Sequence, residues 1–391
     1  MKLIHVFHSP RRASVAVLLV AAVLLTACGA GNTGTWPGIT VSGEQILVSY
    51  GQRIAAIDSA TGARIWDYPP KDDRDTTFSA IPVEVDGVVY VGDYKGRVHA
   101  IDNDGQVKWI YEREIEKLIG PLALEAPDRV IAGIAVSEDR VFVGMGSRDV
   151  IALDRETGAL DWEFETDHGV WSSPLYLPAN ADGNDGEATL YVASLDHSFY
   201  ALDPETGNKR WDIDLGAAAP GDMLYDADRN LIYVGTFLSE MLAIDLSSES
   251  IAARYKAEGW LWDKPAIADD MLYFGDLKGF VYAVRITDDG FQQKWKLPVA
   301  EEPIRGTPAL TNGLVIAGSE DKTVYALSQT DGAISWKATT SGPALTSIIP
   351  IESTGGDDTG IVVVGTTEND ALVVALNSAS GEVDWRYSNE D

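Results

Sequence analysis

Apolar and polar positions along this chain follow a unit of about 45 residues that returns eight times. Each unit holds short apolar or alternating runs, rich in aromatic and β-branched residues, with Gly, Asp, Asn or Ser between them, which is the pattern of β-strands joined by turns. In the fourth unit the expected strands are 171–176, 190–193, 198–202 and 209–213. Helical periodicity is almost absent. Four strands per unit predict an all-β fold, an eight-bladed β-propeller with four-stranded antiparallel blades.

Two features mark every unit. The first is a tripeptide that begins with alanine, such as Ala152-Leu153-Asp154, and the second is an aromatic residue that follows the tripeptide by 7 to 10 residues. One large ring per repeat is expected to cover the junction between adjacent blades, and the small alanine lets a neighbouring backbone or indole come close. The eight aromatic positions are Trp66, Trp109, Trp162, Trp211, Tyr255, Trp295, Trp336 and Trp385, with tyrosine replacing tryptophan in the fifth unit.

The turn between the third and fourth expected strands has its own signature. In 154–158 and 203–207 an aspartate opens the turn and a glycine closes it. The aspartate side chain is expected to accept backbone N–H groups, and the glycine to supply a positive φ angle. The first and last units each contain four expected strands. We therefore expect the ring to close by packing of blade one against blade eight, with an amino-terminal segment that completes blade eight as the alternative.

The amino end has the layout of an export signal. Lys2, Arg11 and Arg12 precede an apolar run over 13–25, and Cys28, the sole cysteine, follows Leu25-Thr26-Ala27. This arrangement resembles a bacterial lipoprotein signal, in which the cysteine is acylated; an ordinary secreted protein with a cysteine there by chance is the alternative. The expected organisation is a signal peptide over 1–27, a lipidated tether over 28–35 and a propeller over 36–391, held to the cell envelope through its lipid.

The charge balance excludes one class of partner. The chain carries 60 acidic and 30 basic residues, a formal net charge of −30. A strongly anionic surface repels phosphate backbones, which argues against nucleic-acid binding. Solubility, adaptation to salt and an interface for a basic partner all remain compatible with the acidity.

No cluster of residues predicts catalysis or a structural metal. Histidines outside the signal fall in different units, and no Cys or His spacing is typical of a metal site. The acidic loop 180–187 could hold calcium or be a solvated hairpin loop. An insertion over 112–119 places Ile115, Leu118 and Ile119 at helical spacing, so that they either contact a partner or fold back onto their own blade.

The combination Ala-x-Asp-x-x-Thr-Gly followed by tryptophan resembles the repeat of the pyrroloquinoline-quinone (PQQ) propeller superfamily, most clearly at 142–162, 191–211 and 315–336. Within that superfamily, an exported lipoprotein with eight such blades resembles the BamB family of propeller subunits in the outer-membrane β-barrel assembly machinery. This resemblance implies a non-catalytic scaffold without a cofactor. Its partners would be other envelope proteins, including that machinery where the host has an outer membrane.

Two other functions remain open. The quinoprotein dehydrogenases of the same superfamily are longer, stack the quinone between a tryptophan and a disulfide of adjacent cysteines, and bind calcium beside a catalytic aspartate. A chain with one cysteine cannot form that disulfide, although some quinoproteins do without it. A sensor or carbohydrate-binding propeller would use exposed aromatic residues such as Trp260 and Trp262; otherwise these two pack at the start of blade six.

Overall fold

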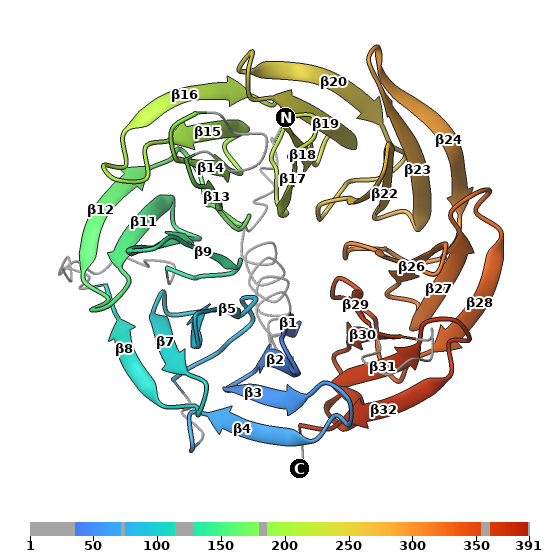
Figure 1. Cartoon of the computed structure of the whole chain (residues 1–391), viewed down its shortest axis with the longest axis horizontal. Coiled ribbons are helices and arrows are strands. Elements are labelled where there is room, and N and C mark those ends of the chain that lie inside the picture. The colour runs from blue at the N-terminus through green and yellow to red at the C-terminus, as the bar shows by residue number, and fades with distance from the viewer. Residues whose placement is uncertain (1–35, 72–74, 114–127, 180–185, 353–359, 390–391) are drawn as a thin grey trace, which may run out of the picture. The chain divides into compact units, whose positions relative to one another are not determined.

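The propeller is built from eight separate sheets. The computed structural model describes residues 36–71, 75–113, 128–179, 186–352 and 360–389. Within these residues, 32 strands form eight antiparallel sheets of four, each made of strands consecutive in the sequence. Figure 1 shows the sheets as blades around a central axis. The predicted eight-bladed β-propeller is therefore confirmed. The expected signal peptide, Cys28 and the tether lie outside the described residues.

Each blade runs from the axis to the rim in chain order (Figure 1). The first four blades are β1 (Gly38–Ser42), β2 (Gln45–Tyr50), β3 (Arg53–Asp58) and β4 (Arg64–Tyr68); β5 (Val83–Val85), β6 (Val88–Gly92), β7 (Val98–Asp102) and β8 (Val107–Tyr111); β9 (Ile134–Val136), β10 (Arg140–Gly144), β11 (Asp149–Asp154) and β12 (Leu160–Glu165); and β13 (Leu175–Leu177), β14 (Thr189–Ala193), β15 (Ser198–Leu202) and β16 (Lys209–Asp214).

The remaining blades repeat this arrangement. They are β17 (Met223–Asp226), β18 (Leu231–Gly235), β19 (Glu240–Asp245) and β20 (Ser250–Lys256); β21 (Ala266–Ala268), β22 (Met271–Gly275), β23 (Phe280–Thr287) and β24 (Gly290–Pro298); β25 (Ala309–Thr311), β26 (Leu314–Gly318), β27 (Thr323–Ser328) and β28 (Ile334–Thr339); and β29 (Ile349–Ile351), β30 (Ile361–Gly365), β31 (Val373–Asn377) and β32 (Val383–Tyr387), with a short 3-10 helix η1 (Asn369–Ala371).

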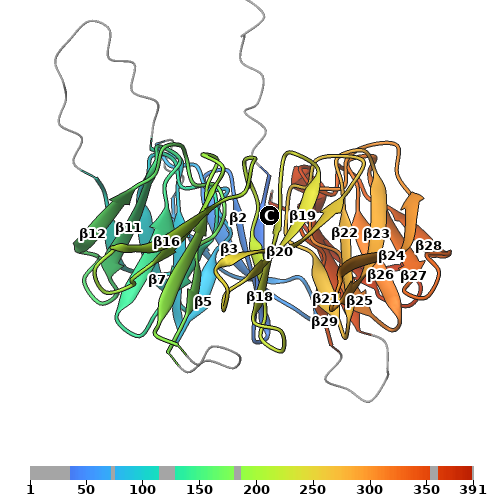
Figure 2. The same ribbon diagram turned by 90° about the horizontal axis from the view of Figure 1, so that it is seen from above.

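The core lies between the sheets, because the two middle strands of each blade are covered on both faces. Their residues are almost all buried, as in β6 and β14, whereas the outer strands alternate between covered and exposed positions, as in β20. This alternation is the period-two pattern of a strand with one face against a neighbour. The side view in Figure 2 shows the blades standing side by side around the ring.

Every blade has the same irregularity in the pairing of its third and fourth strands. The register shifts immediately after the alanine of the tripeptide, for example between Ala152 and Leu153. This bulge places the alanine directly opposite the recurring tryptophan. The pairs are Ala56 and Trp66, Ala100 and Trp109, Ala152 and Trp162, Ala201 and Trp211, Ala283 and Trp295, Ala326 and Trp336, and Ala375 and Trp385.

The fifth blade departs from this rule, and the expected equivalence of Tyr255 is wrong. Ala243 pairs with Ala253, whereas Tyr255 pairs with Met241, one inward-facing position further along β20. The tryptophan position of blade five therefore holds an alanine. Tyr255 instead occupies the position of Tyr68 in β4, two residues after the docking tryptophan.

The turns after the third strands follow the expected chemistry. The Asp154 carboxylate accepts the backbone N–H of Thr157 at 2.8 Å and its hydroxyl at 2.6 Å, and Gly158 has a φ angle of 73°. The hydroxyl hydrogen bond to Thr157 lowers the pKa of Asp154. Asp203 and Thr206 repeat the arrangement.

These turns form the joints between blades. The indole of one blade lies against the turn glycine of the next, and a Cβ atom on that glycine would approach the ring within 2.4 to 3.2 Å. The pairs are Trp66 and Gly105, Trp109 and Gly158, Trp162 and Gly207, Trp295 and Gly332, Trp336 and Gly381, and Trp385 and Gly62.

The last pair joins the two ends of the ring. Trp385 of blade eight covers Gly62 of blade one, and the inner strands β1 and β29 are also in contact. Both blades hold four strands of their own. Closure is therefore by packing, as expected, and involves no exchanged strand.

Candidate functional site at the central axis

The connections that lead into the innermost strands enclose a pocket of 490 Å³ on the axis. All eight blades contribute to its lining, from Trp36 ahead of β1 to Ser347 ahead of β29. One expectation needs correction here. Residues 171–174 belong to the connection and β13 begins at Leu175, so Trp171 and Ser173 line the pocket and are not part of the strand.

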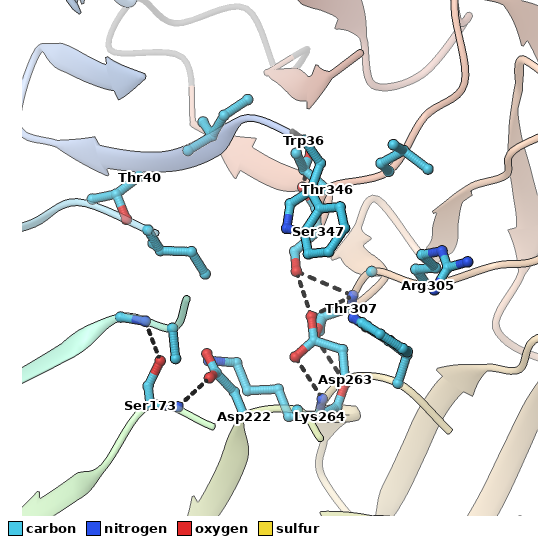
Figure 3. A pocket seen from close by; sticks show the side chains of 18 of the residues that line it. Trp36, Thr40, Ser173, Asp222, Asp263, Lys264, Arg305, Thr307, Thr346 and Ser347 are labelled. Carbon is cyan, nitrogen blue, oxygen red and sulfur yellow. Dashed lines mark hydrogen bonds and ion pairs between the residues drawn. The ribbon is translucent and has the colours of Figure 1, made fainter. Parts of the chain in front are cut away.

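A polar cluster occupies one wall of this pocket (Figure 3). The Asp263 carboxylate accepts the backbone N–H of Lys264 at 2.8 Å, the hydroxyl of Ser347 at 2.7 Å and the backbone N–H of Thr307 at 3.2 Å. Burial, and then the neighbouring carboxylate of Asp222, raise the pKa of Asp263. These hydrogen bonds reduce the free-energy cost of burying the ionised Asp263 carboxylate but do not cancel that cost.

A second carboxylate holds the lysine. The Lys264 ammonium lies 3.6 Å from Asp222, which also accepts the backbone N–H of Ser173 at 2.9 Å. Burial lowers the pKa of Lys264, but the charges of Asp222 and Asp263 outweigh it and hold this pKa above its usual value. The lysine therefore favours the charged form of both carboxylates, whereas burial and the charge of Asp222 disfavour the charged form of Asp263.

Aromatic rings lead from this cluster to the surface. Trp262 lies beside Trp36 with ring centroids 6.3 Å apart, and Phe237 lies between Trp262 at 5.7 Å and Trp260 at 5.0 Å. The Arg305 guanidinium stands 4.7 Å from the Trp262 ring and pairs with Glu320.

The two tryptophans considered at the start of blade six therefore have different environments. Trp262 lines the pocket, whereas Trp260 is 54% exposed at its mouth, and both belong to the connection before β21.

These residues do not fit the quinone of the dehydrogenases. PQQ is a planar ligand with several carboxylates, and it needs cations to bind it and a flat aromatic face to stack on. Lys264 is already engaged by Asp222 and Arg305 by Glu320. Arg305 also occupies the space over the Trp262 ring, and the remaining charged groups of the wall are carboxylates. Among the described residues, no group of three or more His, Cys, Asp or Glu side chains could hold a metal ion.

Most of the sequence-based candidates for partner and calcium binding are not among the residues that the structure describes. Ile115, Leu118 and Ile119 lie outside the described residues, as does most of the loop 180–187. The two ends of the stretch around the insertion are described, and Arg113 pairs with Asp128 at 3.1 Å and with Asp149 at 2.5 Å. The described part of the chain contains no helix that is long and apolar enough to cross a membrane.

Sequence reasoning did not find the axial cluster. Its members come from five blades and carry no motif of their own. A signal does exist once the strands are placed, because Ser173, Thr307 and Ser347 each stand two residues before the first strand of their blade. Aligning the units on these strands would have placed the polar positions on one ring around the axis.

Comparison with known proteins supports both branches of the superfamily. The BamB of Xanthomonas campestris pv. campestris is 24% identical over 322 residues, which are 70% of this chain and 76% of that protein. The quinoprotein ethanol dehydrogenase of Pseudomonas putida is 28% identical over 218 residues, 50% of this chain but 34% of the enzyme. The chain thus spans about a third of the length of that dehydrogenase.

Solved structures agree on the fold. BamB from Moraxella catarrhalis matches with a TM-score of 0.66 and 19% identity, covering 86% of this chain and 92% of that one. A europium-containing methanol dehydrogenase matches with a TM-score of 0.63 and 14% identity, covering 86% and 84%.

The family model described as outer membrane protein assembly factor BamB matches residues 26–132, 122–224, 186–296 and 265–390. These overlapping matches extend over every blade, including the fifth, where the docking tryptophan is absent. The chain therefore belongs to the BamB family of PQQ-type β-propellers.

Proposed function

We propose that this protein is an exported scaffold of the cell envelope, anchored by lipid on Cys28, that binds other envelope proteins and assists outer-membrane protein assembly where the host has an outer membrane. The observation that carries the proposal is the reciprocal coverage with BamB, 70% of this chain against 76% of the relative. The dehydrogenase relative leaves about two thirds of its length unmatched. The poor fit of the axial pocket to the quinone supports the same choice.

An apolar patch at the mouth of the axis supplies a surface for such binding. Leu238 and Trp260 are 49% and 54% exposed, and Trp260 packs on Phe237, whose other neighbour is Trp262 in the pocket. Exposed aromatic rings backed by a rigid scaffold are typical of residues that dominate protein interfaces. The patch occupies the loop between β18 and β19 and the connection before β21.

Site-specific photo-crosslinking in cells tests the proposal. A crosslinking amino acid at Leu238 should give an adduct with a β-barrel assembly protein of the outer membrane. Ile65 on β4 is equally exposed, at 49%, and serves as the matched control that should give no such adduct. Absence of the adduct at Leu238, or equal yield from both positions, would refute a scaffold that binds through this mouth.

A further inference from the structure

The joint between blades five and six lacks the indole that every other blade supplies. Ala253 holds the tryptophan position of β20, opposite Ala243. The ring that comes nearest to replacing the indole belongs to the next blade. Phe291 of β24 lies 6.2 Å from Tyr233 with an interplanar angle of 46°, which repeats the contact between Tyr273 and Trp295 at 6.1 Å and 46°.

Phe291 reaches this place because its hairpin is longer. β23 and β24 continue their pairing beyond the turn position of the other blades, as far as Thr287 opposite Gly290. The outer strands β20 and β24 are adjacent at the rim (Figure 1). A phenyl ring is smaller than an indole, and Phe291 remains half-buried, so it fills only part of the tryptophan position.

The hydrogen-bond acceptor of the missing indole is still in place. At four other joints the indole N–H donates to the backbone oxygen of the residue after the tripeptide, as Trp295 does to Gln329 at 3.0 Å. In blade six that residue is Ile286. Its N–H donates to the Asp270 oxygen at 2.8 Å, just as the N–H of Gln329 donates to Gly313 at 2.9 Å, so the peptide has the same setting.

A cavity of 340 Å³ lies at this joint. An engineered apolar cavity of about 150 Å³ is sufficient to bind benzene, so the volume here accommodates a larger ring. Arg229 and Asp288 also line the cavity, and Asp288 is exposed. The apolar part of the lining consists of Leu231, Ala243, Ala252, Ala253, Ile286, Gly290 and Phe291.

We propose that the joint between blades five and six is a binding site for a tryptophan side chain of a partner protein. The indole enters the cavity beside Ala253 and donates its N–H to the backbone oxygen of Ile286. The other joints define this chemistry, because six of them hold an indole from the fourth strand of one blade against the turn of the next blade. That the indole belongs to a partner protein rests on the proposed scaffold function. That the joint binds an indole does not depend on that function.

Titration of the purified full chain with N-acetyl-L-tryptophanamide, followed by isothermal calorimetry and saturation-transfer NMR, tests the site. Ala253→Trp should fill it from β20 and Phe291→Trp from β24, and each should lower the affinity at least tenfold. Lys337→Trp places an extra indole on the exposed face of β28, one residue after Trp336, and should bind the probe like the parent protein. N-acetyl-L-leucinamide should bind much more weakly than the tryptophan probe.

Two outcomes overturn the assignment of the site. The first is that the probe does not bind to the parent protein. The second is that Ala253→Trp or Phe291→Trp keeps the parent's circular dichroism spectrum, and so is folded, but binds the probe with unchanged affinity. Self-association of the parent that Ala253→Trp abolishes, measured by sedimentation, would make a second copy the occupant and overturn the partner. Probe binding without the Leu238 adduct would reject a scaffold that binds through the axial mouth but not this site. The Leu238 adduct without probe binding would reject only this site.

Discussion

The closure of the ring between blades eight and one gives the sharpest test of the packing. Trp385 and Trp336 are each 9% exposed, and each covers the turn glycine of the following blade. An aromatic side chain buries about 150–250 Å², and at about 25 cal/mol per Å² nine-tenths of that area stabilises the fold by about 3.4–5.6 kcal/mol. Truncation of a buried tryptophan to alanine costs a similar amount, about 3–5 kcal/mol. Trp385→Ala should therefore cost about 3–5 kcal/mol, as an interior joint does.

The hydrogen bonds of the two indoles predict a small difference. Trp336 donates its N–H to the Ser378 oxygen at 3.1 Å, whereas within the described residues the buried N–H of Trp385 has no partner. Trp336→Ala should therefore cost about 1 kcal/mol more, because it also leaves a buried carbonyl unpaired. Trp385→Phe, which removes the unpaired N–H, should cost less than Trp336→Phe.

Urea unfolding followed by far-UV circular dichroism measures both costs. Fluorescence transitions must coincide with those from circular dichroism, because a ring of repeats can lose cooperativity. A cost below about 1 kcal/mol for Trp385→Ala beside a full cost for Trp336→Ala would refute a ring closed as firmly at its seam as elsewhere.

Three further predictions concern single residues. Gly158→Ala should lower the free energy of unfolding by about 2–4 kcal/mol, because the added Cβ would lie 2.5 Å from the Trp109 ring and the φ angle is 73°. Gly43 has a φ angle of 57° but no neighbour within reach of a Cβ, so Gly43→Ala should lower it by only about 1–2 kcal/mol. Equal losses of stability in urea unfolding would refute the contact with Trp109. Because the pKa of Asp263 is raised, its contribution to stability is present below pH 3.8 and is lost as the pH rises through the raised value. The free energy of unfolding of the parent should therefore decline over that pH range, and that of Asp263→Asn, measured in the same pH series, should not. Cys28→Ser should leave uncut precursor or soluble protein, and membrane partitioning of a cleaved Cys28→Ser protein would contradict a lipid anchor.

The repeat can be recognised in the sequence because the joints between blades are built from the same residue types at the same spacing. The aspartate and glycine of 154–158 shape a turn, and at six joints the tryptophan of the preceding blade lies directly against such a turn glycine. The fold, the number of blades and the closure therefore follow from local chemistry that recurs in the sequence. The fifth blade shows where this reasoning stops.

Equal spacing in blades five and six has two different physical origins. Tyr255 and Trp295 both follow the tripeptide by 10 residues. In blade six the extra residues lengthen the hairpin, and Trp295 keeps its place opposite Ala283. In blade five the hairpin is not lengthened, and Tyr255 lies one inward-facing position beyond Ala253. Only the cross-strand register separates the two cases.

The axial cluster could not be predicted from the sequence for a different reason. Asp222, Asp263 and Ser347 are far apart in the sequence, and their side chains meet because the ring brings eight connections to one axis. Neither hydrophobic period nor turn chemistry records which residues of different blades face each other. The pKa of Asp263, which depends on Asp222 and on burial, is likewise a property of the closed ring alone.

The alanine at position 253 also breaks the rotational degeneracy of the propeller. Eight near-copies around an axis offer a partner that recognises the repeat eight almost equivalent angular settings, and such a partner could not distinguish one azimuth from the next. Seven joints carry the same indole, and the joint beside Ala253 carries a longer hairpin and a cavity. As the joint without an indole, it is a landmark on the rim, from which every other angular position on the ring is fixed.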